Sequence, residues 1–411
     1  MVESSPARRI RSPGLPFRRP PTTPAALLTV LLAALAPAAA ACTAPVAETT
    51  GGSSSPAPSP RESAHVERTL SVAGAGDILV HGSIWSQAER DGGGTFDFAP
   101  LLEGISPVLE EADLALCHLE VPLAPPGGPF TGYPVFSAPP QVAAGLAEAG
   151  YDGCSTASNH TLDMGVDGVE RTLSGLEAAG LGFAGSARTE EEARTPRIYS
   201  VRPAEGDPVA AAHLSYTYGF NGFQPPEGRE WTANLIDEDA VLAEAARARE
   251  AGAEIVVLSM HWGTEYAHDA DDAQRSLAQL VTSDDIDLIL GHHAHVVQSV
   301  ERIDGEWVVY GMGNQIAGQS SPPIDSRREG LTVRVEFTEV EPGVWESGTL
   351  AARPTRLALT PDIRLVDLAA ALADPDLPED DRRTLQDAYD RVIAHVDGLG
   401  AAGDPDFVAA G

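Results

Sequence analysis

Lysine is missing from this chain of 411 residues, so all 27 of its basic side chains are arginine. Aspartate and glutamate number 60, which gives a formal net charge of −33 at pH 7. Nucleic-acid binding depends on cationic side chains that neutralise phosphates. The composition therefore argues against nucleic acid as a partner.

The chain also lacks a long hydrophobic run. Its apolar stretch, Ala25–Ala36, follows an arginine-rich start and is too short to span a bilayer comfortably. Small residues then precede Cys42, which is the layout of a secretory signal ending in a lipoprotein cysteine. We therefore expect residues 1–42 to be a signal and lipoprotein segment that leaves lipidated Cys42 on the outer face of the cell membrane. The alternatives are that the signal is cleaved and the protein is released, or that the apolar stretch is retained as a membrane anchor. Residues 43–66, rich in Ser, Pro and Gly, are expected to form a disordered linker.

Cysteine is scarce, with three in the chain. If Cys42 carries a lipid, Cys117 and Cys154 remain as an even pair, and an exported protein can form disulfides. Each lies near the end of a segment with the pattern of a buried strand. We expect two buried free thiols, with a disulfide as the alternative.

Five apolar segments end in polar residues that suit metal binding. They lead into Asp77, Glu120, Asn159-His160, His261 and His292-His293-Ala294-His295. Stretches with helical spacing lie between them, over residues 141–150, 166–180, 238–252 and 270–282. This alternation predicts βαβ units with parallel strands, and ligands gather at the carboxyl ends of such strands. The five strand ends are therefore expected at one edge of an α/β sheet.

These side chains match the chemistry of a centre with two divalent metal ions, Mn, Fe or Zn, because such a centre uses carboxylate, imidazole and amide ligands. The predicted ligands are Asp77, Glu120, Asn159, His261, His293 and His295. His160 adjoins a ligand, and an imidazole can release a proton near neutral pH, so His160 is the predicted general acid. Asp163 is expected to orient His160 or to close the turn before Gly165.

Six motifs, in order, resemble those of the CapA family of poly-γ-glutamate capsule proteins, which are built on the calcineurin-like metallophosphoesterase fold. They cover about residues 70–319 and read Gly76-Asp77-Ile78-Leu79, His118-Leu119-Glu120-Val121-Pro122-Leu123, Ser158-Asn159-His160-Thr161-Leu162-Asp163-Met164-Gly165, His261-Trp262-Gly263-Thr264-Glu265-Tyr266, Gly291-His292-His293-Ala294-His295-Val296-Val297-Gln298 and Tyr310-Gly311-Met312-Gly313-Asn314.

Three positions depart from the family pattern. His118 stands where the family usually has Asn, and Ala294 stands where it usually has Pro between the last two histidines, which makes that turn less rigid. Leu79 replaces the second ligand of the phosphoesterase Asp-x-His motif. His81 or His118 can substitute for that ligand.

The resemblance implies an α/β fold, a four-layer α/β/β/α metallophosphoesterase-like sandwich over residues 67–320. Residues 321–411 are expected to complete this domain. Alternating patterns predict strands over 331–337 and 350–359. Helical spacing predicts helices over 363–373 and 380–395.

The resemblance also implies a function: an exported, membrane-anchored protein of capsule or poly-γ-glutamate biosynthesis whose metal site hydrolyses or handles the polymer. Membrane synthase subunits would be further partners. The same residues also fit a metal-dependent phosphoesterase acting on phosphate esters outside the membrane. A non-catalytic scaffold that binds polymer or synthase subunits is the third alternative.

A polyanionic substrate is repelled by so acidic a chain except where metal or arginine makes the local field positive. Arg327-Arg328 is one candidate for such a place, and a solvated loop is the alternative that we favour for it. The loop over residues 122–139, with Phe130, Tyr133 and Phe136, has two alternative roles, a substrate wall or plain loop packing. We expect His292 to face outward or to support the ligands only. The residues expected to contact substrate are His118, Glu265, Tyr266 and Asn314.

Overall fold

The structure is a computed structural model, and it describes residues 68–282, 285–319 and 325–410. The predicted signal segment, lipidated Cys42 and linker lie outside these residues. Within the described ranges, no helix has the length and apolar character needed to cross a membrane.

A nine-stranded sheet forms one half of the described chain. Its strands β1, β2, β3 and β4 are parallel neighbours, whereas β12, β13 and β14 are antiparallel. Off the main path, β11 pairs with β1 and β15 pairs with β13. In spatial order the strands are β14 (Arg364–Asp367), β13 (Val344–Ala358), β12 (Glu329–Glu341), β1 (Thr69–Leu79), β2 (Leu114–Leu119), β3 (Gly153–Ser155) and β4 (Gly182–Ala184), with β11 (Asn314–Ala317) and β15 (Phe407–Ala409) at the side.

A six-stranded sheet forms the other half. Its strands β6, β7, β8 and β10 are parallel, and the outer strands β5 and β9 are antiparallel. Their spatial order is β5 (Arg197–Val201), β6 (Val209–Thr217), β7 (Ile255–His261), β8 (Leu288–His292), β10 (Glu306–Val309) and β9 (Val300–Ile303).

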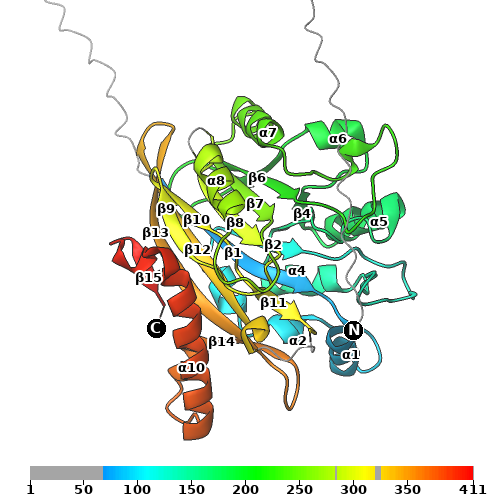
Figure 1. Cartoon of the computed structure of the whole chain (residues 1–411), viewed down its shortest axis with the longest axis vertical. Helices are drawn as coiled ribbons and strands as arrows, with labels where there is room; N and C mark the ends of the chain where they lie inside the picture. The colour runs from blue at the N-terminus through cyan, green and yellow to red at the C-terminus, as the bar shows by residue number, and fades with distance from the viewer. Residues whose placement is uncertain (1–67, 283–284, 320–324, 411) are drawn as a thin grey trace, which may run out of the picture. The chain divides into compact units, whose positions relative to one another are not determined.

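Helices cover the outer faces of the two sheets (Figure 1). The first five pack on the nine-stranded sheet, α7 and α8 pack on the six-stranded sheet, and α10 adds residues to the core between the sheets. The helices are α1 (Gly82–Asp91), α2 (Ala99–Leu102), α3 (Ser106–Glu110), α4 (Val142–Ala149), α5 (Gly165–Ala178), α6 (Glu190–Arg194), α7 (Glu238–Glu250), α8 (Asp272–Val281), α9 (Leu368–Leu372) and α10 (Glu379–Val396).

Alternation along the strands explains this layering, because successive side chains of a strand point to opposite faces. In β1, Leu70 and Val72 belong to the core between the sheets, whereas Ala73 and Ala75 face the helices. In β7, Val257 faces the neighbouring sheet and Val256 faces the helices. The order helix, sheet, sheet, helix follows, and the predicted mixed α/β class is confirmed.

Two local expectations differ from the structure. The five strand ends belong to two sheets instead of one, because Asp77 and Glu120 follow strands of the nine-stranded sheet and His261 ends a strand of the six-stranded sheet. The helix predicted over 363–373 is wrong in its first half, where β14 pairs with β13 before the short α9 begins. This edge pairing overrides the weak helical spacing of that segment.

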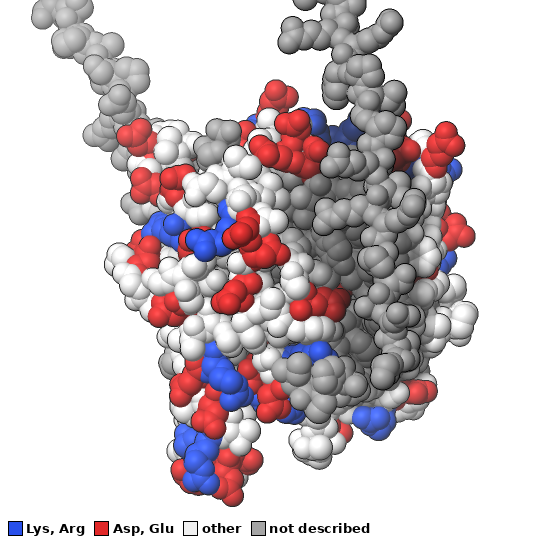
Figure 2. All heavy atoms as spheres, in the orientation of Figure 1, with Lys and Arg blue, Asp and Glu red and all other residues white. Residues whose placement is uncertain are grey.

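Acidic side chains are spread over the face of the molecule seen in Figure 2, with arginines interleaved among them along α10. Many arginines are engaged in ion pairs; on α10, for example, Arg391 pairs with Glu329. A polyanion approaching this surface meets a predominantly negative field.

Candidate metal centre and substrate cavity

The carboxyl ends of strands from both sheets meet at one buried cluster. Asp77 and His118 reach it from the nine-stranded sheet, and His261 and His292 reach it from the six-stranded sheet. The backbone N–H of His293 donates to the Asp77 carboxylate at 3.3 Å, which joins the two sheets across the cluster. The sheets thus bring together residues more than 200 positions apart.

Asp77 lies at the centre of this cluster because the backbone allows close approach there. A Cβ on Gly76 would lie 2.3 Å from the carbonyl oxygen of Gly313, so only glycine fits before Asp77. The register of β1 against β11 also shifts between Asp77 and Ile78. This local irregularity positions the Asp77 carboxylate between the strand ends of the two sheets.

Three overlapping groups of side chains bring metal-ligating atoms within 4.8 Å of one another. Asp77 belongs to two of them and therefore connects these two groups. The groups are Asp77 with His118 and His292, Asp77 with Glu120 and His295, and Glu265 with His293 and His295.

Glu120 gives the strongest indication that this cluster holds a cation. Both of its carboxylate oxygens are buried and have no hydrogen-bond partner among the described residues, and His295 Nε2 lies 3.7 Å from Oε1. Burial raises the pKa of Glu120 well above its usual value. A buried carboxylate without hydrogen-bond partners is costly, and a divalent cation is the group that would offset this cost. The residues present therefore fit a divalent metal ion.

The electrostatics of Asp77 are different. Burial by itself would raise the pKa of this carboxyl, but contacts with His292 and His295 outweigh burial and lower the pKa. His292 Nδ1 lies 3.4 Å from Oδ1 and His295 Nδ1 lies 3.0 Å from Oδ2. Asp77 is thus held as the anion, the form that binds a metal ion.

Most of the surrounding imidazoles are held neutral. Burial, with the nearby histidines, lowers the pKa of His118 and His261 and lowers that of His293 to about 4. His295 differs: burial opposes its charge, yet Glu120 and Asp77 raise its pKa to about 9. Neutral imidazole is the metal-binding form, so His295 has a proton to lose when metal binds.

The turn that carries the last histidines has an uncommon backbone. His293 and His295 have φ values of 87° and 56°, in the left-handed region that side chains other than glycine rarely adopt. This conformation directs both rings into the cluster, where the His293 and His295 rings lie 6.0 Å apart. Backbone strain of this kind is common at functional sites.

His292 was expected to face outward or to support the ligands, and its burial excludes the outward-facing alternative. Its ring stacks on that of His118 at 4.1 Å and lies in one candidate group with Asp77. The residue ends β8 with its side chain in the space between the sheets. Strand periodicity beyond Leu290 was the signal in the sequence that could have identified it.

His118 was expected to contact substrate, but it lies fully buried in the cluster beside Asp77. Of the two residues proposed to replace the ligand missing at Leu79, His118 is therefore the one near Asp77. His81 instead accepts a hydrogen bond from the Gly318 N–H and packs edge-on against Phe136.

Asn159 and His261, both predicted ligands, lie beside the cluster and outside the three groups. His261 Nε2 lies 3.1 Å from Asn159 Oδ1, and its Nδ1 lies 2.9 Å from His118 Nε2. The His261 and His293 rings lie 4.7 Å apart. The structure thus brings all six predicted ligands together, while their individual roles stay predictions.

His160 and Asp163 form a pair next to the cluster. His160 Nδ1 lies 2.7 Å from Asp163 Oδ2, which also accepts the backbone N–H of Phe136 at 2.7 Å. The Phe136 ring packs edge-on against the imidazole at 4.7 Å. These contacts hold the His160 ring by its Nδ1 side at the wall of an adjoining cavity.

That cavity has a volume of about 420 Å³, within the range of about 300–1,000 Å³ typical of small-molecule sites. His295 connects it to the metal cluster, and the predicted substrate residues Glu265 and Tyr266 line it. Asn314 does not: it is buried, and its Oδ1 lies 3.1 Å from His295 Nδ1, so it positions that ring. The remaining lining residues are Leu79, His81, Tyr133, Phe136, His160, Gly318, Gln319 and Arg327.

Two residues near the cluster were not found from the sequence. The Tyr218 ring lies 4.5 Å from that of His293, although almost half of this side chain is exposed. Asn221 has a positive φ and its Nδ2 lies 3.5 Å from His160 Nδ1. Both follow β6, whose carboxyl end was the available signal.

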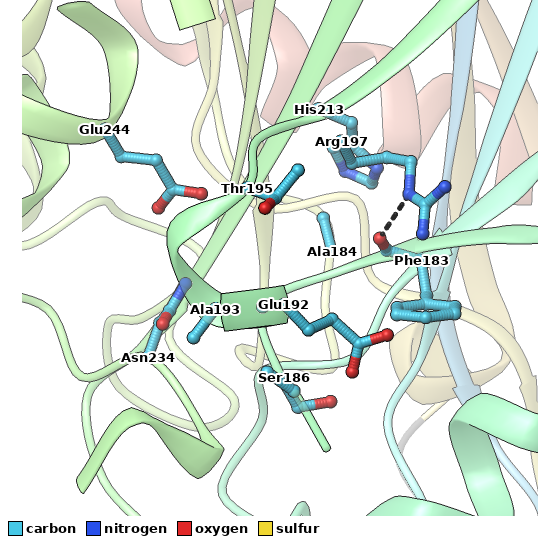
Figure 3. Close-up of a pocket in the computed structure, with 12 residues that line it drawn as sticks. Phe183, Ala184, Ser186, Glu192, Ala193, Thr195, Arg197, His213, Asn234 and Glu244 are labelled. Atoms are coloured by element: carbon cyan, nitrogen blue, oxygen red, sulfur yellow. Dashed lines mark hydrogen bonds between the residues drawn. The ribbon is translucent and has the colours of Figure 1, made fainter. Parts of the chain in front are cut away.

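A second cavity, of about 40 Å³, lies beside β4, β5 and β6 and shares none of the cluster residues (Figure 3). His213, Asn234 and Glu244 contribute polar groups to its wall. Its volume suits a few water molecules, each of which needs about 10–15 Å³.

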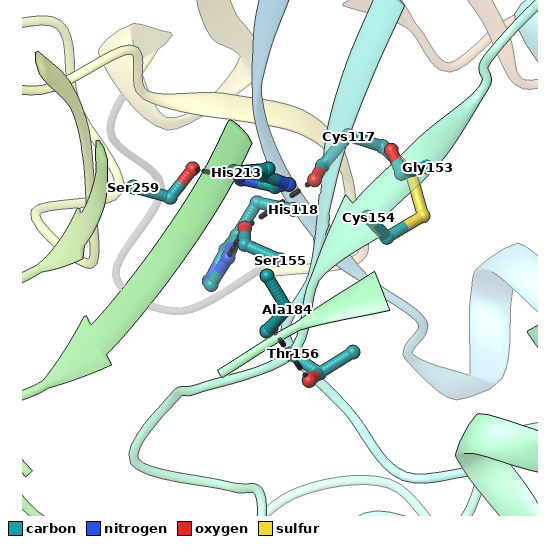
Figure 4. Close-up of a disulfide and its surroundings, with 9 residues drawn as sticks. All are labelled: Cys117, His118, Gly153, Cys154, Ser155, Thr156, Ala184, His213 and Ser259. Atoms are coloured by element: carbon teal, nitrogen blue, oxygen red, sulfur yellow. Dashed lines mark hydrogen bonds between the residues drawn. A yellow bond between two sulfur atoms is a disulfide. The ribbon is translucent and has the colours of Figure 1, made fainter. Parts of the chain in front are cut away.

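Cys117 and Cys154 form a disulfide, which corrects the expectation of free thiols (Figure 4). The two residues are direct partners in the parallel pairing of β2 with β3, with a Cα–Cα distance of 4.4 Å. The next pair along the strands is His118 and Ser155, joined by a hydrogen bond of 2.7 Å. The disulfide thus braces the strand pair that carries one candidate ligand.

Comparison with known proteins is consistent with these features. The family model described as bacterial capsule synthesis protein PGA_cap matches residues 71–319. The PGA biosynthesis protein CapA of Bacillus subtilis is 28% identical over 179 residues, which are 42% of this chain and 44% of that protein. The capsule biosynthesis protein CapA of Bacillus anthracis is 26% identical over 186 residues, 44% of each protein. The match thus spans less than half the length of these curated relatives.

Among solved structures, a calcineurin-like phosphoesterase of Bacillus subtilis is similar to this chain, with a TM-score of 0.45 and 14% identity. The similarity covers 80% of this chain and 98% of that one.

Proposed function

Because the chain belongs to the bacterial capsule synthesis protein family, we propose that it acts in capsule assembly as a metal-dependent hydrolase of an anionic polymer such as poly-γ-glutamate. The names of the two Bacillus relatives, for PGA and capsule biosynthesis, support this substrate class. The six ordered motifs had indicated the same family.

One observation carries the hydrolase proposal: Asp77 joins two groups of metal-ligating atoms, and the buried Glu120 in one of them has no hydrogen-bond partner among the described residues. The chain would hold two divalent cations, Mn, Fe or Zn, through residues of these groups: Asp77, Glu120, His118, His292, His293 and His295. Such ions supply Lewis-acid chemistry and activate water.

The protein's own contribution is to hold substrate and to supply a proton. Asp163 accepts the Nδ1–H of His160, so in the imidazolium form the ring carries a second proton on Nε2, which it gives to the leaving group. Phe136 and Asp163 fix the ring position, so the proton is delivered from a constant direction. Enclosure of the cluster between the sheets keeps bulk water away from Asp77 and Glu120.

The proposed role in capsule assembly also implies a cellular location for the domain. We propose that the domain is exported and tethered by lipidated Cys42 to the outer face of the membrane, or released there, with membrane synthase subunits as partners. The order of basic, apolar and small residues before Cys42 supports this. Mass spectrometry of the membrane-extracted protein tests it, and an unmodified peptide that begins before Cys42 would contradict it.

The activity proposal is tested with purified chain supplied with Mn²⁺, Fe²⁺ or Zn²⁺. Cleavage of poly-γ-glutamate is measured as a decrease in polymer chain length. Cleavage of bis-p-nitrophenyl phosphate is measured as release of nitrophenol. We expect the wild-type chain to cleave the polymer. We expect His293→Ala to lose both this activity and the bound metal. His395→Ala, a histidine on α10, is the matched control and should stay active.

Other results of this assay distinguish the alternatives. Cleavage of the phosphate diester alone would favour a phosphoesterase. Polymer binding without cleavage in the presence of any of the three metal ions would favour the non-catalytic scaffold. Either result contradicts the polymer hydrolase.

A further inference from the structure

We propose that Arg327 is the specificity-determining residue of the substrate cavity, and that its guanidinium binds a free carboxylate of the polymer unit held beside the metal cluster. This inference rests on the proposed substrate class and adds the residue that recognises it. The sequence had marked Arg327-Arg328 only as a place where positive charge gathers.

Arg327 and the next residue, Arg328, have different surroundings. Arg327 lies in the short 3₁₀ helix Asp325–Arg328, is 4% exposed and lines the 420 Å³ cavity. Arg328, the next residue, forms an ion pair with Asp325 and is absent from the described cavity wall. Adjacent arginines thus have different surroundings, and only one of them faces the candidate substrate space.

Arg327 is also held at a defined distance from the metal cluster. Its guanidinium carbon lies 3.7 Å from the centre of the Tyr266 ring, a cation–π contact. The Tyr266 ring lies 6.0 Å from that of His295, and the Tyr266 N–H donates to the Ala294 carbonyl at 2.7 Å. One anchored aromatic ring therefore connects the guanidinium to the turn that carries His293 and His295.

Charge explains why such a residue is needed. A chain of net charge −33 repels a polyanion, and the carboxylate of Glu265 at the same cavity adds to this repulsion. Among the described residues of the cavity wall, Arg327 is the only arginine. A planar guanidinium matches a carboxylate with two parallel hydrogen bonds, which a point charge does not do.

Every unit of a γ-linked glutamate polymer keeps one free carboxylate next to its backbone amide. A carboxylate held by Arg327 would place the neighbouring amide toward His295 and His160, which line the same cavity. Recognition by Arg327 therefore selects units with a free carboxylate and positions them for reaction.

The test measures binding instead of turnover, so its outcome does not depend on hydrolysis. Isothermal titration calorimetry of the full chain with Mn²⁺ compares a short synthetic oligo-γ-glutamate with the same oligomer as its methyl ester. We expect the wild-type chain to prefer the free acid. Arg327→Gln should weaken free-acid binding roughly 10–100-fold and leave ester binding unchanged, since a charge-assisted contact is lost.

Two further variants control for structure. Arg328→Leu should keep the full preference for the free acid, and Arg327→Lys should keep part of it because the charge remains. Metal content, measured by mass spectrometry, should equal that of the wild type in all three variants.

Several results would overturn the proposal. One is equal affinity of the wild-type chain for the free-acid oligomer and its methyl ester. Another is an unchanged preference for the free acid in Arg327→Gln. The third is loss of folding in both Arg327 variants, which would make the residue structural. If the preference depends on Arg327 but no polymer is cleaved, the hydrolase function fails and this inference stands.

Discussion

Replacing Asp77 by Asn should remove both metal ions at once, because this carboxylate belongs to two of the three candidate ligand groups. The substitution keeps the size of the side chain and removes its charge. By contrast, His118→Ala affects only the group with His292, and Glu120→Gln affects only the group with His295. The three variants therefore separate a bridging ligand from ligands of single ions.

The size of the effect follows from linkage between binding and folding. A ligand present at about 100 times its Kd stabilises the folded state by about 2.7 kcal/mol per site. The described residues, 68–282, 285–319 and 325–410, number roughly 340, so their unfolding entropy is about 0.7 kcal/mol/K. Each occupied site should then raise the Tm by about 4 °C, and two sites should raise it by about 8 °C.

Differential scanning calorimetry with and without Mn²⁺ measures this shift, and elemental mass spectrometry counts the bound ions. We expect a shift of about 8 °C in the wild type, about half of it in His118→Ala and Glu120→Gln, and none in Asp77→Asn. For each variant, the Tm with metal is compared with the Tm of the same variant without metal. This is needed because Asp77→Asn loses contacts with His292 and His295, which lowers the free energy of unfolding of the metal-free protein by about 1–3 kcal/mol. An Asp77→Asn protein that still binds two ions with an undiminished shift would refute the bridging role.

Three other changes have defined outcomes. His160→Ala should lower kcat for polymer cleavage by about 10²–10⁴-fold with metal content unchanged, and loss of metal would instead make His160 a ligand. Cys117→Ala combined with Cys154→Ala should lower the free energy of unfolding by about 3–4 kcal/mol in urea titrations, because the disulfide joins residues 37 apart; an unchanged midpoint would show that the bond adds nothing. Burial raises the pKa of Glu306 from 4.5 to about 7, so its stabilising contribution is complete below about pH 4.5 and is lost as the pH rises to 7. Glu306→Gln should therefore flatten the fall in stability between pH 4.5 and 7 by about 1–2 kcal/mol, after allowance for partial exposure, and an unaltered pH profile would contradict the assignment.

Local patterns in the sequence were enough to predict most of the residues that gather at the candidate site. Apolar segments that stop at Asp77, Glu120, Asn159, His261 and His293 indicate strands whose carboxyl ends carry the polar groups, and the structure brings these residues together. Strand alternation and helical spacing are local properties, so they can be read without knowing the partner of each strand. The same reasoning failed over residues 363–373, where pairing with β13 decides the conformation.

Tertiary structure alone decided how those strand ends meet. Two sheets face each other across the cluster, so residues of opposite sheets, such as Asp77 and His293, become neighbours, and sheet assignment depends on long-range pairing that no local pattern contains. The disulfide of Cys117 with Cys154 likewise depends on the register of β2 against β3. The sequence by itself determined the chemistry available at the strand ends. Packing of the two sheets decided that His292 faces inward and that Arg327 lines the cavity, because burial and direction depend on contacts between segments far apart in the chain.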